Sequence, residues 1–327
     1  MIHRGGARNQ TVDSMELAAF ISAGIAAAVT IAVCMLVDHY GGTIAGVIGT
    51  VPHVAVVGSV GFAAVLPVRD FKIAVLAMPV GMLCNSLYAA AMIAASSLLP
   101  RRGVLAGAGW QRLLAVVASG LCVFAVGLAL LLAVVRPKER PLGTAVGLAV
   151  ASWGLEAVLG AWTVWAYPSA PRGDSKSSWW QLLGRGCVTF CVFLLALYLA
   201  TKHPAAAGVL VNLPIVTTVV VVSVWRSTSE AVAVSCLGPM ILGMLSASMY
   251  ALLASDLIPR VGTGGGAVAS WFAAVVGVTL PVLWALQRLR KRRAAAAATK
   301  AAAVTAAAGV GGSSSEDAST ETELTAL

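Results

Sequence analysis

The sequence predicts an all-α fold, a polytopic transmembrane helix bundle of about nine apolar segments with an internal duplication. The 327 residues are 59% hydrophobic and only 11% charged, whereas soluble domains carry about 25% charged residues. The charges are gathered between apolar runs of about 20 residues, the length of a helix that crosses a bilayer. Several uncommon residues also recur in the same order in the two halves of the chain.

The nine apolar segments follow one another through short polar connections. Helix is predicted for all of them, because backbone groups in lipid must be hydrogen-bonded within their own segment. No run shows the two-residue alternation of a barrel strand. The segments are residues 17–37, 42–66, 73–98, 113–135, 142–166, 179–200, 205–224, 232–257 and 267–287.

Polar stretches divide the chain into its predicted parts. A basic run at 288–293 directly follows an apolar segment, as at a helix end near anionic headgroups. The expected partner is therefore the lipid bilayer and not nucleic acid, despite the net charge of +9. The predicted parts are a polar N-terminal tail (1–16), membrane repeat 1 with inserted segment 113–135 (17–166), a linker (167–178), membrane repeat 2 (179–288), and a basic, then disordered C-terminal tail (289–327).

The duplication is predicted from two alignments of the chain with itself. The first alignment, at one constant offset and without a gap, places Pro52 on Pro214, Gly81 on Gly243, Ser86 on Ser248 and Tyr88 on Tyr250. The second, at a smaller offset, places 147–153 on 265–271. Matches among proline, tyrosine and tryptophan in order are not expected from an alanine- and valine-rich composition alone. Together the two alignments define a four-segment unit present twice, with 113–135 inserted in the first copy.

This unit resembles the small four-helix membrane proteins of the GlpM type. The resemblance is carried by Ala207, Gly208, Val209 and Pro214, and by the run G-A-V-A-S-W at 266–271. It implies two tandem copies of a four-helix membrane unit. It transfers no functional residue to this chain.

The number of crossings stays open between eight and nine. Segment 113–135 has no charged residue and is long enough to cross. If it crosses, the first three segments of the two halves run in opposite directions, while 142–166 and 267–287 run in the same direction. Either this segment is a re-entrant or surface helix, or one of the two alignments does not reflect ancestry.

A buried acid is the first candidate for a functional residue. Glu156 lies near the middle of 142–166, four residues after Ser152 and on the same helical face. A carboxylate at that depth costs about 2–3 kcal/mol unless it is paired or protonated. Glu156 could bind a cation or carry a proton; the alternative is a neutral carboxyl group bonded to a neighbouring helix.

The second candidate is a pair of helix breaks at matching positions of the two halves. Pro52 precedes His53, and Pro214 follows closely after Asn212. Proline interrupts helical hydrogen bonding, and interrupted helices in corresponding places point to the binding site of a transporter. Asn85 lies in the middle of 73–98 and is the fifth candidate for substrate binding, with Glu156, Ser152, His53 and Asn212. The alternative is a packing kink whose polar groups are satisfied locally.

Two functional interpretations follow. The first is a carrier of a small solute, ion or proton, with a cavity between the repeats lined by Glu156 and His53. The second is a non-transporting scaffold or accessory subunit with a dry interface. No Ser-His-Asp set, phosphate-binding loop or HExxH motif is present, and the four histidines are scattered. We therefore expect no enzyme, no catalytic residue, no metal and no cofactor, in a multi-pass integral membrane protein.

Overall fold

The computed structural model describes residues 20–32, 50–99, 109–134, 141–167, 178–227 and 229–311, together with the single residues 17, 35 and 47. These residues form helices joined by short turns, and no strand occurs among them. The chain consists of two units, one ending at Leu283 and one beginning at Trp284. The predicted N-terminal tail (1–16), residues 168–177 of the predicted linker (167–178) and residues 312–327 of the predicted C-terminal tail (289–327) lie outside the described residues.

Six helical stretches in the described part are long and apolar enough to cross a membrane, which is the pattern of a multi-pass membrane protein. They are α4 (Val68–Leu98), α6 (Gly109–Val134), α7 (Leu142–Ala166), α8 (Trp179–Ala200), α11 (Glu230–Val261), and a continuous run of α12 (Thr263–Ala274), the π-helix η1 (Val275–Thr279) and α13 (Leu280–Gly311). The α13 helix extends beyond the predicted end at 287 through an alanine-rich stretch, because alanine has the highest helix propensity.

Two of the nine predicted segments are not continuous helices. Segment 205–224 is divided into α9 (Pro204–Leu210) and α10 (Ile215–Ser227). In segment 42–66, the helix α3 (His53–Val65) begins directly after Pro52. Each second half-helix follows a proline, whose missing N–H and fixed φ favour the first turn of a helix and not its interior. The interruptions lie at Pro52 and Pro214, the two prolines proposed as helix breaks from the sequence.

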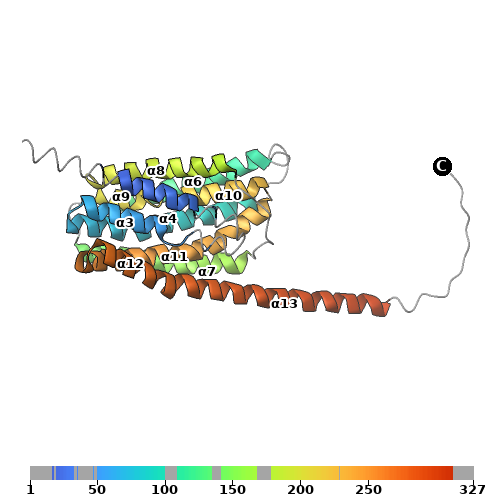
Figure 1. The fold of residues 1–327 in the computed structure, drawn as a ribbon. Helices are drawn as coiled ribbons and strands as arrows, with labels where there is room; N and C mark the ends of the chain where they lie inside the picture. The colour runs from blue at the N-terminus through green and yellow to red at the C-terminus, as the bar shows by residue number, and fades with distance from the viewer. Residues whose placement is uncertain are drawn as a thin grey trace, which may run out of the picture. The chain divides into compact units, whose positions relative to one another are not determined.

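Helices α4 and α11 are the most buried membrane-length helices of the first unit and lie side by side in it (Figure 1); together they form the central pair. Near one end, Lys72 Nζ of α4 lies 3.6 Å from Asp256 Oδ1 of α11. Near the middle, the Ser86 hydroxyl of α4 donates to Met244 Sδ of α11 at 3.4 Å. The residue numbers rise along α4 as they fall along α11, so the two helices are antiparallel.

An arginine joins three helices at the other end of this pair. Arg112 of α6 forms an ion pair with Glu230, its Nε lying 2.8 Å from Oε2. Its Nη1 and Nη2 donate to the carbonyl oxygens of Leu99 and Ser96, at the end of α4 where helical carbonyls have no intrahelical partner. About 36 Å of α4 separates Lys72 from Ser96 at 1.5 Å per residue, and no charged residue lies between them. This apolar length matches a hydrocarbon core of about 30 Å.

The α6 helix runs antiparallel to α4 along most of its length. Gly120 of α6 faces the ring of Tyr88, and Gly127 faces Cys84. Residue numbers rise along α6 as they fall along α4, so α6 starts beside the C-terminal end of α4 and runs towards its N-terminal end.

The α7 helix packs on the other member of the central pair. Its Trp153 Nε1 donates to Leu245 O of α11 at 3.2 Å, and Val164 lies against Gly238 further back along α11. Helix α7 is therefore antiparallel to α11 and parallel to α4.

Candidate functional site

A small cavity lies where the two helix breaks meet the central helix pair. Its volume is about 70 Å³, and since a buried water needs about 10–15 Å³ in this measure, it has room for on the order of five waters. Five parts of the fold contribute to its wall: the first break, directly before α3; the second break, between α9 and α10; and helices α4, α8 and α11. Its lining includes Thr50, Pro52, His53, Val54, Ala55, Met82, Asn85, Thr189, Phe193, Asn212, Thr217, Met240 and Met244.

Three residues that line this cavity each carry a buried polar atom without a hydrogen-bond partner. These atoms are His53 Nε2, Asn212 Oδ1 and Thr189 Oγ1. Asn212 is 3% exposed and Thr189 is 5% exposed. A buried polar atom without a partner costs about 1–3 kcal/mol, and three such atoms around one cavity point to an occupant that satisfies them.

The orientation of the Asn212 amide is determined by its neighbours. Its Nδ2 donates to Met78 O at 3.2 Å and to Gly208 O at 3.1 Å. Both partners are carbonyl oxygens, which only accept, so the nitrogen must lie on their side. The oxygen Oδ1 is therefore the acceptor without a partner.

The same reasoning assigns the tautomer of His53. Its Nδ1 lies 2.7 Å from Val51 O. Since that carbonyl can only accept, Nδ1 carries the proton, and Nε2 of the neutral ring is a hydrogen-bond acceptor. The His53 ring thus has one bond to the backbone, and its other nitrogen is buried without a partner.

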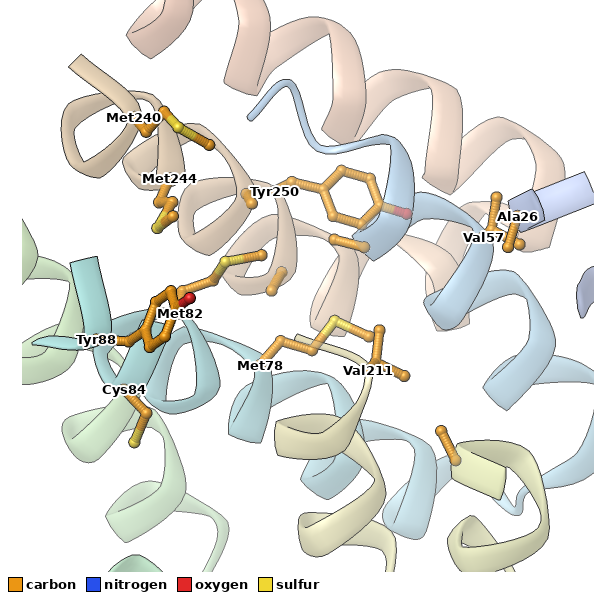
Figure 2. Close-up of a cluster of buried hydrophobic side chains, with 14 of the residues drawn as sticks. Ala26, Val57, Met78, Met82, Cys84, Tyr88, Val211, Met240, Met244 and Tyr250 are labelled. Carbon is orange, nitrogen blue, oxygen red and sulfur yellow. The ribbon is translucent and has the colours of Figure 1, made fainter. Parts of the chain in front are cut away.

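The remaining wall is mostly apolar and comes from the central pair. Figure 2 shows Met82 of α4 and Met240 and Met244 of α11 between these two helices. The side chain of Met78 extends towards Val211, which follows α9, so α4 packs against the second break at this point. Met82 and Asn85 lie near the middle of the uncharged stretch of α4, so the cavity is near the middle of the apolar zone.

Glu156 lies elsewhere and is not among the lining residues. It is fully buried between α7 and α11, where its Oε2 accepts from the Ser248 hydroxyl at 2.8 Å and its Oε1 has no partner. Among the described residues, no cation pairs with it. An isolated charged carboxylate is far more costly to bury than a neutral acid, so the neutral form suits these surroundings. Ser152, one turn earlier on α7, is also buried.

The structure therefore brings together some predicted site residues and separates others. Pro52, His53, Asn85 and Asn212 line one cavity, and Pro214 lies in the second break beside it. Asn85 Oδ1 accepts from Thr217 Oγ1 at 3.4 Å. Glu156 contacts α11 through Ser248, and neither Glu156 nor the buried Ser152 is among the residues that line the cavity with His53.

Three polar lining residues, Thr50, Thr189 and Thr217, are not among the candidates predicted from the sequence. Thr50 falls on Asn212 in the same self-alignment that places Pro52 on Pro214, so that alignment could have identified it. Thr189 is a polar residue in an apolar segment, and the cost of polar groups in lipid is the signal that would have found it.

In the part of the chain that the structure describes, no group of three or more His, Cys, Asp or Glu side chains could hold a metal ion. The fold is that of a multi-pass helical membrane protein, with a small cavity whose mostly apolar wall carries a few polar side chains. Comparisons with family models, curated proteins and solved structures found no match.

Proposed function

We propose that the protein is a membrane carrier, not an enzyme, built from two inverted three-helix repeats, with its substrate site in the cavity between them. Each repeat contains an N-terminal helix, a proline-broken helix and a long central helix. Broken helices that face each other across an inverted repeat are the usual place of a secondary transporter's binding site.

The spacing of helix boundaries supports the repeat. Helix α3 begins at residue 53 and α10 at residue 215, while α4 begins at residue 68 and α11 at residue 230. Both pairs of starting residues have the offset that places Pro52 on Pro214. The first apolar segment, predicted to start at 17, and α8, which starts at 179, have the same separation. The starts of the helices in the structure thus have the same offset as the alignment of the sequence with itself.

Packing between the copies follows the same offset. A Cβ atom at Gly81 of α4 would lie 3.0 Å from Val209 Cα, in the second copy. A Cβ atom at Gly243 of α11 would lie 3.2 Å from Val47 Cα, in the first copy. Each central helix therefore packs closely on the broken helix of the other copy, at matching residues.

The repeated tyrosines cross between the copies in the same way. Tyr88 of α4 is hydrogen-bonded to Thr218 of α10 at 2.6 Å. Tyr250 of α11 is hydrogen-bonded to Ser59 of α3 at 2.5 Å. The two partners lie one helical turn apart in the self-alignment, so the helices that the tyrosines join are reciprocal although the partner positions are not identical.

The antiparallel direction of α4 and α11 supports inversion of the second copy. Inversion requires an odd number of crossings from one copy to the next, which agrees with α6 running antiparallel to α4. On this proposal there are nine crossings, and the match of 147–153 to 265–271 is not part of the repeat. The unit then has three helices, one fewer than the GlpM-type proteins that its broken helix resembles.

The observation that carries the carrier proposal is the cavity beside the two breaks, whose lining residues His53, Asn212 and Thr189 of α8 each have a polar atom without a partner. The test is two-sided access to that cavity. We would introduce Thr189→Cys into a variant whose native cysteines are replaced by alanine, and add a membrane-impermeant thiol reagent to vesicles of each orientation. The matched control is Thr163→Cys, since Thr163 is fully buried on α7 and does not line the cavity.

The proposal predicts modification at position 189 from both faces of the membrane and at position 163 from neither. A carrier exposes its site alternately to the two sides. Modification at position 189 from neither side would instead support the scaffold interpretation, and modification from one side only would contradict alternating access.

A further inference from the structure

We infer that the occupant of this cavity is a small uncharged solute that both donates and accepts hydrogen bonds, in the size range of a short amide. This inference rests on the proposed carrier function and specifies its substrate class. Four properties of the cavity carry it: its charge, its acceptors, its donors and its volume.

The first property is the absence of a charged partner. Among the described residues that line the cavity there is no Asp, Glu, Lys or Arg, and His53 is the one titratable side chain. A buried ion without a counter-charge loses its hydration and gains no compensating pair. Glu156 is bonded to Ser248 outside this lining and does not supply a charge to it. A net charge on the ligand is therefore disfavoured for either sign.

The acceptors come from both breaks. His53 Nε2 follows the first break and Asn212 Oδ1 lies in the second, and both have no protein donor. They require a ligand with at least two N–H or O–H groups. A ligand that carries only acceptors, such as a carboxylate, leaves both atoms unsatisfied.

The donors lie on the same cavity. The Thr189 hydroxyl has no partner, and α3 has no side-chain cap on its first turn. Val54 and Ala55 belong to that turn and line the cavity. First-turn N–H groups have no intrahelical acceptor, so they can donate to a carbonyl or hydroxyl oxygen of a ligand.

The volume and the apolar wall restrict the size. At about 70 Å³ the cavity is far below the roughly 300–1,000 Å³ of sites for drug-sized molecules. Met82, Met240, Met244 and Phe193 supply an apolar surface that suits a methyl or methylene group. Acetamide has these features: a carbonyl acceptor, two N–H donors, one methyl group and no charge.

The test compares three molecules of nearly equal shape and different charge. The full-length protein is reconstituted in vesicles, and uptake of acetamide, acetate and acetamidinium is measured against protein-free vesicles. We expect protein-dependent uptake of acetamide above that of either ion. Uptake of acetate or acetamidinium equal to or faster than that of acetamide would overturn the inference, as would the lack of any protein-dependent acetamide uptake.

Matched variants connect the uptake to the cavity. Thr189→Val keeps the shape and removes the hydroxyl, and we expect acetamide uptake to fall about fivefold, the effect of one hydrogen bond. Thr163→Val, which removes a hydroxyl bonded to Gly160 O of its own helix, is expected to leave uptake unchanged. Unchanged uptake in Thr189→Val, or an equal fall in both variants, would contradict the assignment.

A second pair of variants separates the backbone bond of His53 from its Nε2 acceptor, since each variant keeps one of the two. His53→Asn keeps a donor for Val51 O and lacks the Nε2 acceptor, so uptake should fall; His53→Gln places an amide group near the Nε2 position and should retain more uptake. The reverse order would contradict the inference. Modification of position 189 from both sides without acetamide uptake would contradict the proposed substrate class but support the carrier function. Modification from neither side would contradict both proposals.

Discussion

Gly81→Ala tests the close contact between α4 and the broken helix α9–α10. A Cβ atom at this position would lie 2.9 Å from Val209 O, 3.0 Å from Val209 Cα and 3.1 Å from Asn212 Nδ2. Carbon atoms in favourable contact are about 3.5–4.0 Å apart. Two of these neighbours are backbone atoms, so the broken helix itself must move by about 0.5 Å or more to restore that separation.

The expected loss of stability follows from two opposing effects. Overpacking of a well-packed interface costs about 1–3 kcal/mol. Alanine in place of glycine within a helix returns about 0.5–1 kcal/mol. We therefore expect Gly81→Ala to lower the free energy of unfolding by about 1–2 kcal/mol. The side chain of Asn212 must also move, so uptake of the substrate should fall with stability.

The assay is equilibrium unfolding in mixed micelles by titration with sodium dodecyl sulfate, followed by tryptophan fluorescence. The control is Gly154→Ala on α7, where no atom lies within 4 Å of the added Cβ. This variant should be as stable as the wild type or more stable by up to about 1 kcal/mol. If Gly81→Ala is as stable as the control variant, α4 does not approach the broken helix as described, and the reasoning on the repeat packing is refuted.

Two further predictions concern buried polar contacts. Glu156→Gln should change the free energy of unfolding by less than about 1 kcal/mol, because the amide keeps an oxygen for the Ser248 hydroxyl and the site suits a neutral group; a loss above about 2 kcal/mol in the same assay would indicate a charged, paired carboxylate. Glu230→Gln should lower the free energy of unfolding by about 1–3 kcal/mol, less than the roughly 3–5 kcal/mol expected for breaking a fully buried ion pair. The loss is smaller because Arg112 keeps its carbonyl partners and the Glu230 side chain is 22% exposed. Adding Arg112→Leu should recover part of that loss, and strict additivity in the double-mutant cycle would exclude coupling between the two side chains.

The helical membrane class could be predicted from the sequence because it depends on local properties. The length of an apolar run and the scarcity of charge determine which segments can cross a bilayer, whatever their neighbours are. Helices α7 and α8 begin and end where the hydropathy of the sequence places them, at Leu142–Ala166 and Trp179–Ala200. The positions of the two helix breaks depend only partly on local sequence. Proline removes a helical hydrogen bond wherever it lies, yet Pro79 inside α4 and Pro239 inside α11 do not divide their helices.

Partners across the bundle could not be predicted in this way. His53 and Asn212 lie in different halves of the chain, and only packing of both breaks on α4 and α11 brings them to one cavity. Glu156 looked like a lining residue because a buried acid is costly, but that cost is the same beside Ser248 as beside a cavity. Hydropathy shows how deep a side chain lies in the membrane, but not the direction in which its helix face turns.

The sequence by itself therefore determined the helical membrane class, the bounds of α7 and α8, and the prolines after which α3 and α10 begin. Only the tertiary structure decided that α4 and α11 are antiparallel, that the breaks share a cavity, and that Glu156 lies against α11. The physical reason is that lipid contact acts on each segment separately, whereas direction and facing depend on close packing between helices distant in the chain.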